Sequence, residues 1–263
     1  MVQLKNIAVI GAGNMGGAIV RGICRSGMDT GIRVANPSAS KLESLRADCP
    51  GIVTTHSNTE AAGGADAVIL AVKPWILPGV VEELKPLLVS KKPIVISIAG
   101  GVDLSRLEEM LGDGLPLFHV IPDTAISVGH GMTFIASRHA DEAARQAVRD
   151  IFATMGRAAL VEERLMGAAT ALSSCGIAYV FKYIQACVQA GVQLGFRPDD
   201  ALNYVTATVD GAVALLQADG VSPQEEIDRV TTPGGMTIRG INALEHSGFT
   251  SAVINGIIEP LKK

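Results

Sequence analysis

Residues 7–16 have the sequence Ile-Ala-Val-Ile-Gly-Ala-Gly-Asn-Met-Gly and are the strongest indication of the fold. The four apolar residues Ile7–Ile10 are typical of a buried strand in a parallel sheet. A helical pattern follows from Asn14 to Ser26, and Gly27 ends it. Glycines at this junction permit a tight turn and let a diphosphate approach the N–H groups at the helix start. We therefore predict that the loop binds a dinucleotide rather than forming a ligand-free turn, through Gly11, Ala12, Gly13, Asn14, Met15 and Gly16.

Strands and helices continue to alternate as far as about Val161. The pattern predicts further strands at 32–35, 67–72, 94–98, 117–121 and 132–136, and helices at 38–46, 75–88, 103–111 and 141–155. This order is typical of an α/β, doubly wound, mostly parallel sheet of the Rossmann type. Beyond Val161 only helices are predicted, at 168–194, 198–218, 223–230, 237–246 and from 250. We predict a dinucleotide-binding domain at 1–161 and an all-helical dimerisation and substrate domain at 162–263.

The composition is poor in charge for a soluble protein. Of 263 residues, 48% are hydrophobic and 18% charged, whereas a soluble domain usually carries about 25% charged residues. The apolar content excludes a disordered chain, and a net charge of −4 argues against nucleic-acid binding. The shortage of charge is concentrated at 168–189 and 205–218, and helices that are apolar all round need burial on every side. We therefore predict a homodimer or higher homo-oligomer formed through the helical domain.

The end of the second predicted strand bears on the choice of cofactor. NAD-selective sites usually place Asp or Glu there to bind the ribose hydroxyl, but this chain has Asn36, followed by Ser38, Ser40 and Lys41. A neutral amide with hydroxyls and one lysine tolerates a 2′-phosphate that a carboxylate would repel. We predict NADPH as the cofactor, with NADH possible. The alternative is that these residues only cap the next helix.

Other segments also follow predicted strands, at the sheet edge where ligands bind in open α/β sheets. From them we predict further cofactor contacts at Asn58, Ala71, Val72, Lys73, Pro74 and Ala99. Asp123 lies at the same edge and is a candidate substrate contact. A structural loop is the alternative for each segment taken alone.

In the helical half, residues 231–237 read Thr-Thr-Pro-Gly-Gly-Met-Thr. A proline and two glycines before a helix expose N–H groups at its positive end, which suits a carboxylate. The Thr237 hydroxyl both donates and accepts hydrogen bonds. The segment therefore predicts a carboxylate-binding site, with an ordinary capped turn as the alternative.

Compartment and metal content are also open to prediction. The four cysteines lack C-x-x-C spacing and the histidines lack an H-E-x-x-H pattern, so we predict reduced thiols, no metal and a cytoplasmic protein. Glycines interrupt the first apolar run, which argues against a signal peptide. The uncharged stretch 165–181 is interrupted by Ser and Gly and is short for a membrane span, so no membrane contact is expected.

Taken together, these motifs resemble the pyrroline-5-carboxylate reductase family over nearly the whole chain. The resemblance is carried by residues 7–17, Ala71-Val72-Lys73-Pro74, segments 171–173, 178–181 and 190–192, and above all 230–238 with Leu244-Glu245. It implies NAD(P)H-dependent reduction of a cyclic imine, the last step of proline biosynthesis, at a site where two subunits meet. It also implies that Thr232, Gly234, Gly235 and Thr237 bind the substrate, with the Thr237 hydroxyl as the catalytic contact to the ring nitrogen.

The chain departs from the family pattern on the expected substrate side. The departures are at Asp123, Ala125, Cys175, Ile177 and Met236. Two other functions remain as alternatives. One is another imine or hydroxyacid dehydrogenase, although Lys182 lacks the G-x-x-G-x-G neighbours that a 3-hydroxyacid enzyme needs. The other is a non-catalytic NADPH-binding module.

Overall fold

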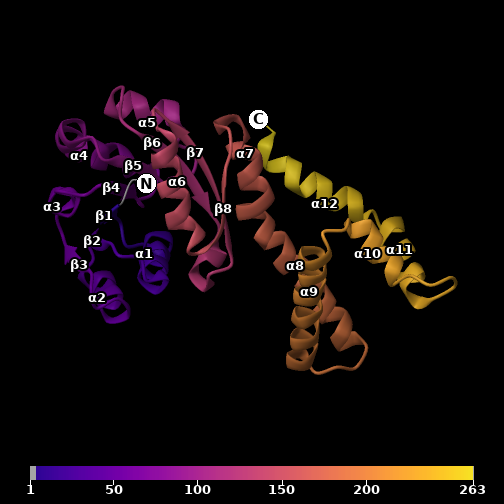
Figure 1. The fold of residues 1–263 in the computed structure, drawn as a ribbon. Helices are drawn as coiled ribbons and strands as arrows, with labels where there is room; N and C mark the ends of the chain where they lie inside the picture. Colours follow the sequence, from indigo (N-terminus) through magenta and orange to yellow (C-terminus); the bar gives the residue numbers. More distant parts are fainter. Residues whose placement is uncertain (1–3, 263) are drawn as a thin grey trace. The chain divides into compact units, whose positions relative to one another are not determined.

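Eight strands in the first part of the chain form one sheet in the order β3-β2-β1-β4-β5-β6-β7-β8 (Figure 1). Their bounds are β1 Asn6–Ile10, β2 Gly31–Ala35, β3 Val53–Thr55, β4 Ala67–Leu70, β5 Ile94–Ser97, β6 Leu117–Pro122, β7 Gly131–Arg138 and β8 Gly156–Leu160. The first six strands in this order, from β3 through β1 to β6, pair in parallel. Strand β7 is antiparallel to β6, and β8 is parallel to β7. The predicted doubly wound, mostly parallel sheet is confirmed in this computed structural model, which describes residues 4–262.

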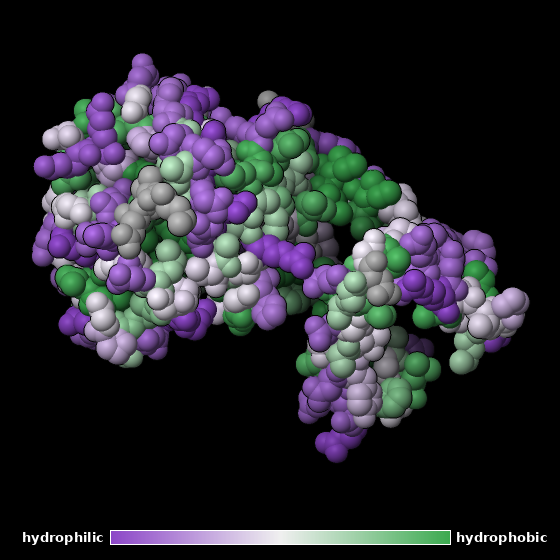
Figure 2. Space-filling view, viewed as in Figure 1, coloured by the Kyte–Doolittle hydropathy of each residue, from purple (hydrophilic) through white to green (hydrophobic). Residues whose placement is uncertain are grey.

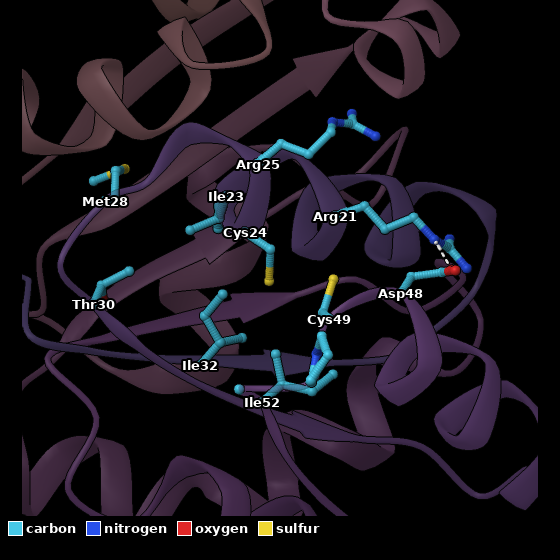
Figure 3. A pocket seen from close by; sticks show the side chains of 12 residues that line it. Arg21, Ile23, Cys24, Arg25, Met28, Thr30, Ile32, Asp48, Cys49 and Ile52 are labelled. Atoms are coloured by element: carbon cyan, nitrogen blue, oxygen red, sulfur yellow. Dashed lines mark hydrogen bonds and ion pairs between the residues drawn. The ribbon is translucent and has the colours of Figure 1, made fainter.

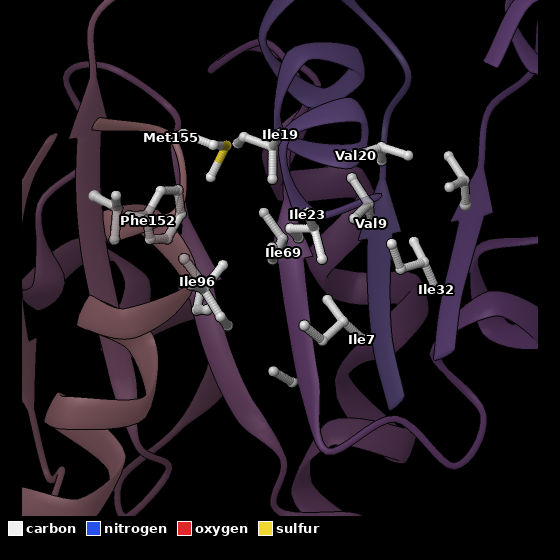
Figure 4. Packing of buried hydrophobic residues seen from close by; sticks show 14 of the residues in the cluster. Ile7, Val9, Ile19, Val20, Ile23, Ile32, Ile69, Ile96, Phe152 and Met155 are labelled. Carbon is white, nitrogen blue, oxygen red and sulfur yellow. The ribbon is translucent and has the colours of Figure 1, made fainter. Parts of the chain in front are cut away.

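Helices cover both faces of the sheet. Their bounds are α1 Asn14–Ser26, α2 Ala39–Asp48, α3 Asn58–Ala62, α4 Leu77–Lys91, α5 Leu104–Leu111, α6 Glu142–Ala153 and α7 Met166–Ala169. On β1, Ile7 and Val9 pack with α1, α2 and α6, whereas Ala8 and Ile10 pack with α3, α4 and α5. Figure 4 shows the first of these clusters, with Ile19 and Ile23 of α1 lying against the strands. Burial on both faces explains why the strands read as unbroken apolar runs.

The secondary structure differs from the prediction at several elements. Strand β3 and helix α3 were not predicted, because segments of three and five residues are too short to show a periodic pattern. Strand β8 was not expected, because its sequence Gly-Arg-Ala-Ala-Leu lacks the β-branched residues that mark strands. The single helix predicted at 168–194 is instead α7, a π-helix at Thr170–Cys175, and α8 at Gly176–Gln193. In the π-helix Ser173 Oγ donates to Asp123 Oδ2 at 3.1 Å, and Ser174 Oγ donates to the Pro122 carbonyl at 3.4 Å. These hydroxyls tie the irregular turn to the end of β6.

The chain divides into two compact units between Ser174 and Cys175. The second unit consists of α8 and four further helices, α9 Pro198–Asp219, α10 Pro223–Arg229, α11 Met236–His246 and α12 Phe249–Ile258, followed by a short 3-10 turn at Glu259–Leu261. The predicted boundary at Val161 lies before this division, so it stays a prediction.

Within the second unit, α8 and α9 approach closely where Gly191 faces Ala201. A Cβ at residue 191 would lie 3.0 Å from the Ala201 Cβ, so glycine sets this spacing. Ala201 is the one buried residue that the structure describes beyond residue 174. Of 26 exposed large hydrophobic side chains in the described chain, 19 lie in this unit. Figure 2 shows hydrophobic residues gathered over α12. The unit therefore has almost no core of its own.

Candidate functional site

The glycine-rich loop between β1 and α1 packs tightly against β2 and β4. Gly11 has φ +109 and donates from its N–H to the Ala35 carbonyl at 2.8 Å. A Cβ at residue 11 would lie 2.5 Å from the Ala71 carbonyl oxygen. A Cβ at residue 16 would lie 2.1 Å from the Gly11 carbonyl oxygen. Both positions therefore require glycine, and the loop and Ala71 come together as predicted.

Gly13 is a different kind of glycine, because its surroundings are open. It precedes α1 as the N-cap with φ −72, and a Cβ there would meet no atom within 4 Å. No side chain caps α1, and its first turn contains no acidic residue. The N–H groups of the first turn have no partner inside the helix and carry partial positive charge. The loop thus forms a cradle that an anionic diphosphate fits.

Asn36 is buried beside this cradle and joins the two predicted parts of the cofactor site. Its Oδ1 accepts from the Ala12 N–H at 3.0 Å, and its Nδ2 donates to the Ser38 carbonyl at 3.4 Å. The amide therefore shapes the loop while adding no negative charge. Ser38 is the N-cap of α2, but its hydroxyl pairs with Ser40 Oγ at 3.0 Å instead of capping the helix. This arrangement leaves a pair of hydroxyls beside the loop.

A cavity of about 230 Å³ lies between the loop, α1 and α2. Its lining contains two cationic side chains and no acidic one: Ala12, Gly13, Asn14, Gly17, Arg21, Ser40, Lys41, Ser44 and Leu45. Arg21 and Ser44 were not recognised in the sequence analysis. Their spacing in the sequence could have indicated them, because each lies one helical turn after another residue of the cavity. Arg21 follows Gly17 by four residues, and Ser44 follows Ser40 by four.

The remaining predicted cofactor residues lie at the same sheet edge. Register aligns Ile10 with Leu70 and Leu70 with Ser97, so residues 71–74 and Ala99 follow neighbouring strand ends. Ala99 is buried, and its N–H donates to Ser97 Oγ at 3.3 Å. Asn58 begins α3, and its Nδ2 donates to Glu83 Oε2 at 2.7 Å. The Asn58 amide is therefore engaged by α4 in this structure.

Asp123 is a buried carboxylate at the end of β6. It accepts hydrogen bonds from the Ala125 N–H at 2.9 Å, the Met132 N–H at 3.1 Å and Ser173 Oγ at 3.1 Å. These donors come from three separate segments, so the carboxylate anchors the β6 end to β7 and to the π-helix. Its predicted contact with substrate stays a prediction.

In the second unit, residues 231–235 form the turn before α11, and Met236 and Thr237 begin that helix. Gly234 has φ +69, and Gly235 is the N-cap of α11 without a side-chain cap. The Gly235 N–H donates to the Thr232 carbonyl at 3.0 Å. This N–H is therefore engaged within the turn, although it was predicted to bind the substrate carboxylate. The N–H groups of Met236 and Thr237 belong to the first helical turn, and both side chains are exposed. The segment keeps an open helix start that suits a carboxylate.

A larger cavity of about 670 Å³ lies on the other side of Arg21, between α1, β2 and the end of α2. Figure 3 shows the Cys24 and Cys49 side chains facing each other within it. Burial and a hydrogen bond with Cys49 raise the pKa of the Cys24 thiol to about 12. The cavity does not include the glycine-rich loop, so it is separate from the predicted cofactor site.

His119 is a buried titratable residue that belongs to no recognisable sequence motif. It lies on β6 in register with Ser97, and neither ring nitrogen has a hydrogen-bond partner. Burial lowers its pKa from the usual range. Among residues 4–262, no group of three or more His, Cys, Asp and Glu side chains is placed to hold a metal ion.

The sheet order, the open glycine-rich loop and the helical second unit define a two-part NAD(P)-dependent oxidoreductase. Comparison with known proteins narrows this class. A family model for pyrroline-5-carboxylate reductase dimerisation matches residues 163–263, and one described as NADP oxidoreductase, coenzyme F420-dependent, matches residues 6–101.

Among curated relatives, a pyrroline-5-carboxylate reductase of Methanosarcina acetivorans is 37% identical, over 98% of this chain and 96% of its own. Pyrroline-5-carboxylate reductase 2 of Dictyostelium discoideum is 35% identical, over 98% and 92%. The solved reductase from Coxiella burnetii has a TM-score of 0.92 at 33% identity, covering 98% of this chain and 96% of its own. The Plasmodium falciparum enzyme, solved with NADP bound, has a TM-score of 0.87 at 30% identity, over 99% and 97%.

The chain belongs to the pyrroline-5-carboxylate reductase family. It is an NADPH-dependent oxidoreductase that reduces pyrroline-5-carboxylate, a small molecule, in proline biosynthesis. The predicted family, fold, reaction and cofactor are therefore confirmed, whereas the residue roles stay predictions.

Proposed function

We propose that the loop of residues 11–16 holds the diphosphate of NADPH and that residues 231–237 hold the substrate carboxylate. The open face of Gly13 carries the cofactor half of this proposal, because the start of α1 there has neither a capping side chain nor an acidic residue. Asn36, Ser38 and Asn58 line the adenosine side, and Ala71, Val72, Lys73, Pro74 and Ala99 line the path along the sheet edge.

On the substrate side, the N–H groups of Met236 and Thr237 bind the carboxylate, with Thr232 and the adjacent glycines shaping the turn. When bound, NADPH supplies the hydride that converts the C=N bond into a secondary amine. A protonated imine accepts hydride more readily than a neutral one. The Thr237 hydroxyl keeps the proton at the ring nitrogen, directly or through water.

Two substitutions of Thr237 test this role. Thr237→Val keeps the shape and removes the hydroxyl, and it should lower kcat at least about tenfold, which corresponds to about 1.4 kcal/mol. Thr237→Ser keeps the hydroxyl and should remain within about threefold. Neither change should alter the Kd for NADPH. A Val variant with wild-type turnover would show that the hydroxyl has no part in the reaction.

A substrate panel separates this reaction from its alternatives. Oxidation of NADPH is followed with pyrroline-5-carboxylate, with other cyclic imines and with 3-hydroxyacids, and NADH is run in parallel. Lys182, the one lysine considered for a hydroxyacid enzyme, is exposed and donates to Gln185 Oε1 at 3.1 Å. We expect turnover of the imine and none of the hydroxyacids. Binding of NADPH without turnover of any imine would favour the non-catalytic module.

The helical unit also supports a homo-oligomer. By length and composition alone, the stretch Glu163–Gln193 could cross a membrane. The same stretch is the first part of residues 163–263, which match the family model for pyrroline-5-carboxylate reductase dimerisation, and this match favours burial against another subunit. Within this unit only Ala201 is buried among the described residues, so its apolar helix faces are left uncovered. A second copy of the chain would bury them. We propose a cytoplasmic homodimer or higher homo-oligomer formed through this unit, with the N-terminal domain ending near Val161. A monomer in analytical ultracentrifugation at micromolar concentration would contradict the assembly.

A further inference from the structure

Arg21 is held in one place over the glycine-rich end of α1. Its Nε donates to Asp48 Oδ2 at 2.7 Å, and its Nη2 donates to Ser44 Oγ at 3.4 Å. A Cβ at residue 17 would lie 3.0 Å from Arg21 Nη1. The guanidinium is therefore folded back over Gly17, in the direction in which helical side chains point, toward the N-terminus of α1. Gly17 provides the space that this conformation needs.

Asp48 binds only Nε of Arg21, and Arg21 also lines the cavity of about 230 Å³. In the described residues Nη1 makes no hydrogen bond. Lys41 lines the same cavity from α2 and forms no ion pair within residues 4–262. Ser40 and Ser44 add hydroxyl donors. Figure 3 shows the ion pair between Arg21 and Asp48 at the larger cavity. Arg21 lines both cavities, whereas Asp48 lines only the larger one.

The lining of this cavity fits a phosphate group. Two cations and two hydroxyls surround it, no carboxylate lines it, and the loop Ala12–Asn14 completes the wall together with Gly17 and Leu45. A planar guanidinium binds phosphate oxygens through paired donors, and a lysine adds a point charge. A diphosphate at the loop places the adenosine ribose beside Asn36, which bonds to Ala12. The 2′-phosphate is the further anion that distinguishes NADPH from NADH.

We propose that Arg21 is a specificity-determining residue that selects NADPH over NADH by binding the 2′-phosphate in this cavity together with Lys41. The proposal rests on the proposed placement of the diphosphate at residues 11–16. Asp48 is a positioning residue, because it fixes Nε and thereby turns the other guanidinium nitrogens toward the cavity.

A purely structural ion pair is the competing explanation. Arg21 and Asp48 side chains are 35% and 49% exposed, and ion pairs at such exposure contribute little to stability. A structural role would change the thermal midpoint and affect both cofactors alike. A specificity role changes the affinity for the phosphorylated ligand alone, so a comparison of paired ligands separates the two.

The test measures binding of 2′,5′-ADP and 5′-AMP to the full chain by calorimetry, and KM for NADPH and NADH by absorbance. Arg21→Gln should weaken 2′,5′-ADP about tenfold, the size expected for one charge-assisted hydrogen bond. Its 5′-AMP affinity should stay within about twofold. Lys41→Gln should show the same selectivity. Arg25→Gln is the matched control, because Arg25 lies one turn later on α1, lines only the larger cavity and donates to the Ser127 carbonyl.

In turnover, Arg21→Gln should raise KM for NADPH about tenfold while leaving kcat and KM for NADH unchanged. Equal weakening of both ligands, or no weakening of either, overturns the proposal. Arg21→Lys is the second variant if Arg21→Gln does not fold. Its loss of 2′,5′-ADP affinity should be smaller than the further loss that results when Lys41→Gln is added to make the double variant. If no imine is reduced, the proposed function fails, whereas the binding comparison still decides the role of Arg21.

Discussion

Replacing Asp123 with alanine should destabilise the first unit by about 3 kcal/mol, because three donors lose their common acceptor. The carboxylate is 8% exposed and receives the N–H groups of Ala125 and Met132 and the Ser173 hydroxyl. Each partly buried donor left without a partner costs about 1–3 kcal/mol. We use the lower end for all three, because the small side chain leaves room for water at the site.

Asparagine should be intermediate, with a loss of about 1 kcal/mol. Its one carbonyl oxygen still accepts from two of the donors, but its NH₂ group faces the third. Urea unfolding followed by circular dichroism, at one protein concentration and without cofactor, measures the order wild type, Asn, Ala. Asp113→Ala is the control, since Asp113 is exposed and should change stability by less than about 0.5 kcal/mol. An alanine variant as stable as that control would show that the Asp123 carboxylate does not hold the three segments together. The KM for the imine shows separately whether Asp123 contacts substrate.

Three further results are expected. Gly16→Ala should lower NADPH affinity at least about tenfold by calorimetry, because its Cβ would lie 2.1 Å from the Gly11 carbonyl oxygen, whereas Gly79→Ala has open space and should not. Burial lowers the pKa of His119 below 6.5, so the unfolded chain binds more protons than the folded chain as the pH falls through this range. The urea midpoint of unfolding should therefore be lower at pH 5.5 than at pH 7.5, and this decrease should be smaller in His119→Leu. Cys24, with a pKa of about 12, should react with iodoacetamide at pH 8 far more slowly in the folded than in the unfolded protein, as mass spectrometry would show.

The N-terminal fold was largely predictable because burial on both faces leaves a direct pattern. Ile7–Ile10 and Ala67–Leu70 read as apolar runs since helices cover each side of the sheet. Strand β8 escaped prediction because it starts at Gly156, with φ +137, and contains no β-branched or aromatic residue. A Cβ at residue 156 would lie 2.1 Å from the Gly131 carbonyl oxygen. Its position is set by close contact with β7 rather than by side-chain pattern.

The candidate site was predictable where chemistry follows chain order, and less so where distant residues meet. The loop of residues 11–16 needs only its own glycines and the strand before it. Arg21 reaches the cavity because Asp48, 27 residues away, binds its Nε. The three donors to Asp123 lie up to 50 residues away from it in the sequence. Such contacts depend on tertiary packing, which spacing along one sequence does not reveal.

We expect this chain to deliver hydride from NADPH to the imine carbon of pyrroline-5-carboxylate. The most direct test uses NADPH carrying deuterium at the transferred position of the nicotinamide ring, with mass spectrometry and NMR of the product. We expect proline with one deuterium on the ring carbon that is bonded to nitrogen and lies away from the carboxylate. Absence of proline, or proline without deuterium at that carbon, would exclude this hydride transfer.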